Sequence, residues 1–123
     1  MRIMTSLIAK VGSIAPLEPG ERILCAAYVS GTGSSIGSSL VAVSDRRLLH
    51  APRSAFLSRG SWRSQRLDDV RLEFGTRRTL GFAAAHRFVI IDADGFPLTF
   101  ELEQKKDAGE FRKAFGRRLV GSR

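Results

Sequence analysis

The order of hydrophobic and polar positions predicts a chain that is mostly β-structure between two helices. Its clearest segment is residues 40–49 (LVAVSDRRLL), where two apolar runs flank Ser44, Asp45 and Arg46. Alternating β-branched residues interrupted by Ser and Asp are typical of a strand, a tight turn and a second strand. Asp45 suits such a turn because its carboxylate accepts hydrogen bonds from nearby backbone N–H groups.

Other segments have the composition of strands, namely residues 22–30, 61–67, 70–74, 86–92 and 96–103. Asp94-Gly95 separates the last two, and an Asp-Gly pair between apolar runs predicts a two-residue hairpin turn with positive φ angles. Phe56 and Leu57 lie in an irregular segment, and we expect both to fold back onto the core. With the hairpin, these segments predict about seven antiparallel strands.

Helical periodicity marks both ends of the chain. Apolar residues recur at helical spacing between residues 2 and 11, and Gly12 with Pro16 is expected to end that helix. We expect it to pack over the domain, while the alternative is a contact with a membrane or with another copy.

A second amphipathic helix is predicted to begin at Asp107, as an N-cap with Glu110 as its capping-box partner, and to stop at Gly121. Its apolar face would contain Ala108, Phe111, Phe115 and Leu119. The length of 123 residues suits one domain. We divide it into residues 1–16, the N-terminal helix and lead-in, and residues 17–121, the strands with the terminal helix.

The composition is that of a globular domain, but the net charge of +8 is unusual and comes mainly from arginine, with 16 Arg against 4 Lys. A basic domain can bind nucleic acid, anionic lipid or an acidic protein, and net charge alone does not choose among them. The candidate binding residues lie at turns or on polar strand positions: Arg46, Arg47, Arg53, Arg59, Arg63, Arg77 and Arg78.

These arginines would form one anion-binding surface if the loops around Arg59 and Arg77 meet at one end of the strands. The alternative is a solvated surface whose arginines pair with the 12 carboxylates. Nucleic acid is the weaker prediction, because single-strand binders use exposed aromatic residues. The phenylalanines mostly occupy predicted core positions, which leaves Tyr28 and Trp62 as the other rings.

The sequence offers little for catalysis. Cys25, His50 and His86 are far apart in strand-like runs, where a buried thiol and satisfied histidines are expected. No spacing fits a zinc site, and Gly31-x-Gly33 lacks the lysine and the following helix of a phosphate loop. We predict a non-enzymatic protein without cofactor or metal. No signal peptide or membrane span is evident, so we expect a cytoplasmic protein, with peripheral membrane contact as an option.

Several motifs in this order resemble those of the bacterial pleckstrin-homology-like (PH-like) domains, a superfamily that includes the GRAM domains. The resemblance covers nearly all of the chain from Leu17, and its carriers are Leu17-x-Pro19-Gly20-Glu21, the 40–49 hairpin, Trp62 with Leu67-Asp-Asp-Val70, Asp94-Gly95 and the Phe-containing terminal helix. It implies a partly open barrel of seven strands plugged by the C-terminal helix, in a family that mostly serves as a binding scaffold.

Lipid-binding members of that superfamily in eukaryotes place Lys and Arg around the first hairpin loop, whereas residues 31–39 here contain neither. Two functions follow as hypotheses. The first is a module that binds a protein, a peptide or its own copies, with a location near an anionic membrane surface as an option. It would use a sheet edge or the groove beside the terminal helix. The second is an arginine-mediated binder of lipid headgroups or nucleic acid.

Overall fold

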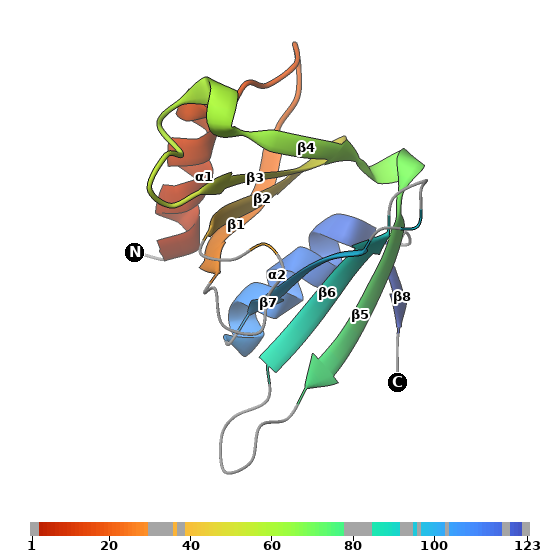
Figure 1. Ribbon diagram of the computed structural model, residues 1–123. Coiled ribbons are helices and arrows are strands. Elements are labelled where there is room, and N and C mark those ends of the chain that lie inside the picture. Colours follow the sequence, from red (N-terminus) through yellow and green to blue (C-terminus); the bar gives the residue numbers. More distant parts are fainter. Residues whose placement is uncertain are drawn as a thin grey trace.

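The computed structural model describes residues 3–29, 36, 39–77, 85–91, 95, 97–102, 104–116 and 119–121. The elements in these ranges (Figure 1) are, in order, α1 (Ile3–Ile14), β1 (Ile23–Val29), β2 (Ser39–Ser44), β3 (Arg47–Pro52), the 3-10 helix η1 (Arg59–Ser61), β4 (Arg63–Arg66), the 3-10 helix η2 (Leu67–Asp69), β5 (Arg71–Arg77), β6 (Ala85–Ile91), β7 (Pro97–Leu102), α2 (Lys105–Phe115) and β8 (Leu119–Gly121).

The strands form two sheets with the orders β1-β2-β3-β4 and β7-β6-β5-β8. Hydrogen-bonded neighbours are antiparallel except β8, which runs parallel to β5. The predicted mainly β fold class is confirmed, and β1 to β7 correspond to the seven expected strands. In the described ranges no ladder joins the two sheets, so the barrel is open.

Strand β2 is buried along its whole length because both of its faces are covered. Its inward side chains, Val41 and Val43, belong to the core shared with the second sheet and α2. Its other side chains, Leu40 and Ala42, pack in a separate outer cluster with α1. A strand covered on both sides can be apolar at successive positions, which explains the run LVAV.

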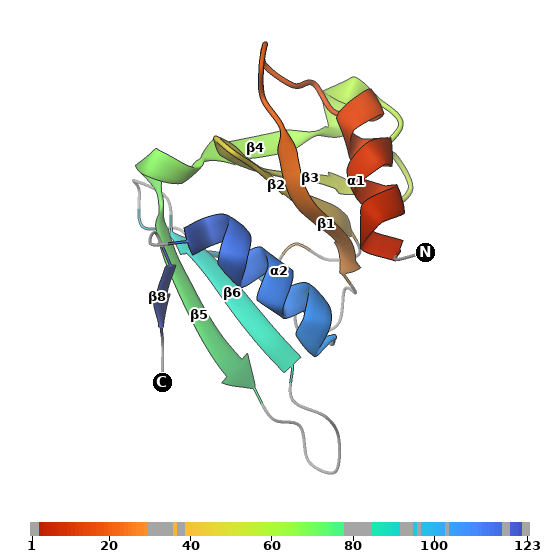
Figure 2. The ribbon, with the colours of Figure 1, turned by 180° about the vertical axis from the view of Figure 1, so that it is seen from behind.

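Helix α2 closes the interior on the other side (Figure 2). Phe111 and Phe115 project from it onto a phenylalanine pair of the second sheet, Phe88 and Phe100, whose ring centroids are 5.2 Å apart. The Phe111 ring meets Phe100 edge-on at 5.5 Å, a favourable geometry for aromatic pairs. Burial of these four rings fixes the helix over the sheet.

The prediction that α1 ends at Gly12 is wrong. The helix continues to Ile14, and the backbone N–H of Ala15 donates to the Val11 carbonyl at 2.8 Å. Val11 and Ala15 are both buried against the sheet, and tertiary packing of this face outweighs the low helix propensity of an exposed glycine. The helix packs over the domain, as expected.

Both predicted ends of α2 are also wrong. Gln104, not Asp107, is the N-cap, and Asp107 lies in the first turn, where its charge still complements the helix dipole. The helix ends at Gly116, whose φ of 59° lies in the region that favours glycine. Leu119 therefore belongs to β8 and not to the helical apolar face.

Of the remaining local predictions, some are confirmed and others are wrong. The 40–49 hairpin is confirmed as β2 and β3, and Gly95 has the positive φ (84°) that the turn requires, while Asp94 lies outside the described residues. Strand β4 begins only at Arg63, after the 3-10 helix η1. Phe56 is half-buried, as predicted, but Leu57 is 73% exposed.

Candidate functional site

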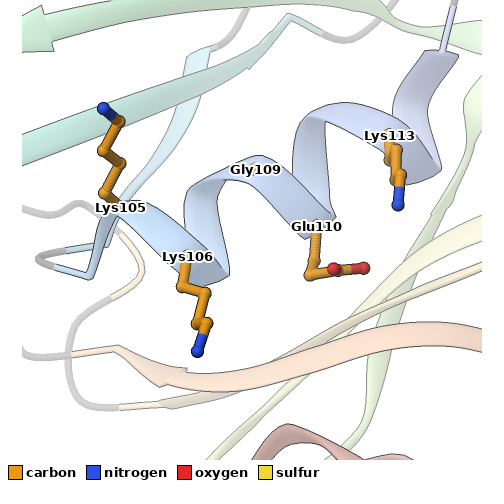
Figure 3. Close-up of a pocket in the computed structure, with 5 residues that line it drawn as sticks. All are labelled: Lys105, Lys106, Gly109, Glu110 and Lys113. Atoms are coloured by element: carbon orange, nitrogen blue, oxygen red, sulfur yellow. The ribbon is translucent and has the colours of Figure 1, made fainter.

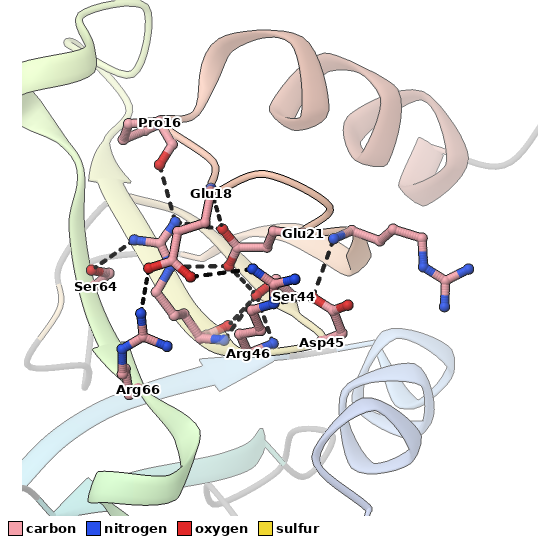
Figure 4. Close-up of polar contacts among 10 residues, drawn as sticks. Pro16, Glu18, Glu21, Ser44, Asp45, Arg46, Ser64 and Arg66 are labelled. Atoms are coloured by element: carbon pink, nitrogen blue, oxygen red, sulfur yellow. Dashed lines mark hydrogen bonds and ion pairs between the residues drawn. The ribbon is translucent and has the colours of Figure 1, made fainter.

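The β2–β3 turn is held by a buried ion pair, shown in Figure 4. The Arg47 guanidinium donates from Nε and Nη2 to the two carboxylate oxygens of Glu21, at 2.9 Å and 2.5 Å. The Glu21 side chain is fully buried, and that of Arg47 is 11% exposed. The hydroxyl of Ser44 also donates to Glu21, and it accepts from the backbone N–H groups of Arg46 and Arg47 at 3.0 Å and 2.8 Å.

Burial by itself would raise the pKa of Glu21, but hydrogen bonds from Arg47, Ser44 and the backbone of Glu18 lower it to about 2. The hydrogen bond to Glu21 in turn raises the pKa of Arg47. The remaining Arg47 donors reach the Pro16 carbonyl at 3.0 Å and the Ser64 hydroxyl at 3.3 Å. Arg47 therefore ties the lead-in, β3 and β4 together, and four of its five N–H donors are occupied.

Glu18 extends this network toward solvent. It pairs with Arg46 at 3.4 Å and also with Arg66. We call the set Pro16, Glu18, Glu21, Ser44, Asp45, Arg46, Arg47, Ser64 and Arg66 the paired end of the first sheet. Two of the seven predicted binding residues, Arg46 and Arg47, thus lie where carboxylates of the same chain already neutralise them.

The opposite end of the same sheet contains residues 52–63, which we call the arginine loop. Short turns hold its backbone, because the N–H groups of Ala55 and Ser58 donate to the carbonyls three residues earlier, both at 3.0 Å. The Trp62 indole N–H donates to the Phe56 carbonyl at 2.8 Å. The buried Trp62 thereby anchors the loop from below.

The side chains of the arginine loop that face solvent are basic, apolar or those of serine, and none is acidic. Arg53, Arg59 and Arg63 are exposed, and among the described residues none of them pairs with a carboxylate. Leu57 is by far the most exposed large hydrophobic residue of the described chain, at 73% against 36% for Leu24. Residues 46–67 contain six arginines and no Asp or Glu.

Aromatic contacts extend this basic character to the neighbouring elements. The Arg53 guanidinium lies 4.5 Å from the ring centroid of Tyr28, and the Lys10 ammonium of α1 lies 5.4 Å from that of Phe56. Such contacts position cations without neutralising them. Lys10 of α1 therefore adds one cation beside the arginine loop.

The other predicted candidates lie elsewhere. Arg77 ends β5, and the structure describes its backbone only, while Arg78 lies outside the described residues. The tip of β5 and the β3–β4 connection lie at opposite ends of the molecule in Figures 1 and 2. The structure brings together Arg53, Arg59 and Arg63, and it does not bring Arg77 to them.

Two hollows lie near α2. One, of about 590 Å³, has Lys105, Lys106, Gly109, Glu110 and Lys113 among its lining residues. The other is a cleft of about 190 Å³, whose lining includes Arg53 beside the two acidic residues Glu101 and Asp107. The cleft mixes charges of both signs and favours no single ligand charge, whereas the larger hollow is mostly lysine-lined.

The groups considered for catalysis are not arranged for it. Cys25 is buried and its pKa is raised by desolvation, which disfavours the reactive thiolate. Burial and the charge of Arg63 lower the pKa of His50. The His86 ring stacks on Phe74 with centroids 6.3 Å apart. Among the described residues, no three His, Cys, Asp or Glu side chains are grouped as metal ligands.

Comparison with solved structures finds the crystal structure of a pleckstrin homology domain from Shewanella amazonensis SB2B. The two structures agree with a TM-score of 0.56 over 94% of this chain and 96% of that chain, at 15% sequence identity. This chain has a PH-like fold. The resemblance recognised in the sequence motifs is therefore confirmed at the level of the fold.

No protein-family model matches the chain, and no curated protein matches it. A shared fold does not by itself identify a ligand or an activity. No described helix has the length and hydrophobicity needed to span a bilayer.

Sequence reasoning missed two features of these surfaces. The exposure of Leu57 was unexpected, although a leucine between Arg53 and Arg59 in an acid-free segment is a signal that could have indicated it. The lysine-lined hollow was also missed, and its signal is a glycine at an outward helical position between lysines. The pairing of Arg47 with Glu21 had no signal, because 26 residues separate the partners.

Proposed function

We propose that this chain is a non-enzymatic PH-like interaction module that binds an anionic membrane surface through its arginine loop. The observation that carries the proposal is the exposed Leu57 between arginines that no described carboxylate neutralises. An apolar side chain can enter the boundary between headgroups and acyl chains, while the cations around it remain among the headgroups. Each Arg or Lys near an anionic surface contributes about 1 kcal/mol.

Other ligands fit this surface less well. Base-stacking needs exposed rings, but Trp62 is buried and the Tyr28 ring carries Arg53. Self-association stays a prediction for the sheet edges. A membrane-peripheral module in the cytoplasm agrees with the single, buried Cys25 and with the absence of any pair of cysteines.

The test is sedimentation of the protein with vesicles of phosphatidylcholine alone and of phosphatidylcholine with phosphatidylserine, at low and at high salt. We expect binding to the serine-containing vesicles only, and release as salt rises, because screening weakens the attraction. The Arg59→Ser/Arg63→Ser double variant should bind these vesicles roughly 30-fold more weakly, at about 1 kcal/mol per arginine.

Matched controls separate this loop from general charge and general hydrophobicity. Arg71 is also exposed but pairs with Glu73, and Leu24 is the other exposed leucine among the described residues. Leu57→Ser should weaken vesicle binding roughly tenfold, from the loss of buried apolar area. Arg71→Ser and Leu24→Ser should change it little. Equal effects of Leu57→Ser and Leu24→Ser, or binding to uncharged vesicles, would refute the proposal.

A further inference from the structure

The outer face of α2 contains a hollow centred on a glycine (Figure 3). The opposite face of the helix, with Ala108, Phe111 and Phe115, is buried in the core. Gly109 and the three lysines of the hollow are exposed, and the hollow measures about 590 Å³. This volume lies within the range of about 300–1,000 Å³ found for ligand pockets.

The described part of the chain gives no structural reason for a glycine at position 109. A Cβ atom built there meets nothing within 4 Å, so no close contact excludes a side chain. Its φ is not in the left-handed region, unlike that of Gly20, Gly95 and Gly116. A glycine inside a helix costs about 0.5–1 kcal/mol relative to alanine. What glycine provides here is room for another molecule close to the α2 backbone.

The charge around this hollow is mostly positive. Lys106 and Lys113 project from the same side of α2 as Glu110, and Lys105 projects to the other side (Figure 3). The methylene stems of the three lysines and the bare backbone of Gly109 offer an apolar floor. The ammonium groups of the same lysines form a cationic rim. Such a surface suits an apolar ridge flanked by carboxylates.

We propose that the hollow at Gly109 docks an acidic amphipathic helix of a partner protein. Small residues let two helices approach closely, and the distance between packed helices depends on the side chains at the crossing. Apolar anchors of the partner would lie over Gly109, and its Asp or Glu residues would meet the lysines. A bilayer suits this hollow less well, since the described part of α2 exposes no large apolar side chain to insert.

This site lies on a different element from the arginine loop and goes beyond the membrane function proposed above. The probe is a synthetic amphipathic helix with leucines at i, i+3, i+4 and i+7 and glutamates on its flanks. A matched peptide carries lysine in place of every glutamate. We expect calorimetry to show binding of the acidic peptide, and roughly tenfold or more weaker binding of the basic one. Amide shifts in NMR spectra should map to α2.

Two glycine variants give a matched pair. Gly12 in α1 is also exposed, and a Cβ built there also meets nothing within 4 Å. Gly109→Leu should weaken acidic-peptide binding roughly tenfold by filling the hollow, while Gly12→Leu should leave it unchanged. Gly109→Ala and Gly12→Ala should both keep the fold, which unfolding curves verify. If a leucine variant fails to fold, this alanine pair still gives a comparison. We expect Gly109→Ala to weaken peptide binding measurably and Gly12→Ala to leave it unchanged.

Several results would overturn the proposal. One is equal affinity for the acidic and the basic peptide, and another is unchanged affinity in both Gly109 variants. A third is no peptide binding together with weaker vesicle binding by Lys106→Glu/Lys113→Glu, which would assign α2 to the membrane surface instead. Failure of the arginine-loop variants to affect vesicles would refute the membrane function without touching this site.

Discussion

The two ends of the β1–β4 sheet use arginine in opposite ways. At the paired end, Arg47 is nearly buried and gives its donors to Glu21 and to neighbouring oxygens. In the arginine loop, Arg59 and Arg63 are exposed, and no described carboxylate neutralises them. The same residue type therefore stabilises the fold at one end and is available to a ligand at the other. What differs is the presence of a buried carboxylate.

Removal of Arg47 should show the difference between the two ends most strongly, as a loss of stability. Arg47→Ala leaves the buried Glu21 carboxylate without its partner, and we expect the free energy of unfolding to fall by roughly 3–5 kcal/mol. Arg59→Ala should change it by less than about 0.5 kcal/mol. Urea unfolding curves of both variants measure the difference. Losses of similar size would mean that the ion pair does not distinguish the two ends.

The stability of the protein at acid pH should depend on the ion pair of the paired end. The pKa of Glu21 is lowered to about 2 in the folded protein, so its contribution is complete above its ordinary value of 4.5 and is lost as the pH falls toward 2. The shift corresponds to roughly 3 kcal/mol of unfolding free energy. Urea unfolding at several pH values measures it.

A control variant isolates this carboxylate from the other acids. Glu21→Gln/Arg47→Met removes both charges of the buried pair, and its unfolding free energy should fall less steeply between pH 4.5 and 2 than that of the wild type. The same slope in both proteins would show that other carboxylates cause the acid sensitivity.

Arg53 should behave as an intermediate between the two ends. Its guanidinium lies over the Tyr28 ring and forms no ion pair with a described carboxylate, so Arg53→Ala should lower the unfolding free energy by about 0.5–1 kcal/mol. A double-mutant cycle with Tyr28→Leu isolates this contact from the loss of side-chain packing. A coupling energy of zero would place Arg53 with the fully solvated arginines.

The smallest effect is expected at an exposed member of the paired end. Arg66 pairs with Glu18, but its side chain is 52% exposed. Exposed pairs contribute about 0.2–1 kcal/mol, so Arg66→Ala should cost no more than that, and less at high salt. Unfolding curves at two salt concentrations measure it. A loss as large as that of Arg47→Ala would show that pairing alone, and not burial, decides.

Much of the fold could be predicted because it depends on local patterns. The 40–49 hairpin follows from two apolar runs around Ser44 and Asp45. The Ser44 hydroxyl accepts from the turn N–H groups of Arg46 and Arg47, but the Asp45 carboxylate accepts from the distant Arg22 N–H and not from the turn, so that part of the prediction is wrong. The limits of α1 and α2 could not be predicted in this way. Val11 and Ala15 gain more from burial than Gly12 costs, and Gly116 ends a helix whose pattern suggested a later stop.

The candidate sites were less predictable than the fold. The list of seven arginines in the sequence treats them as equivalent, although Arg47 and Arg59 have different partners. The difference arises because folding places Glu21 beside Arg47 from a separate part of the chain. Folding also leaves Leu57 in solvent, although its hydrophobic side chain suggested burial.

The sequence by itself determined the order of elements, the excess of arginine and the acid-free segment around the arginine loop. These properties depend on residues that are neighbours in the chain. Only the tertiary structure decided which cations are neutralised, which apolar side chain stays exposed and where a glycine leaves a helix bare. Ion pairs and burial depend on contacts between distant segments, and such contacts exist only once the two sheets and α2 have packed together.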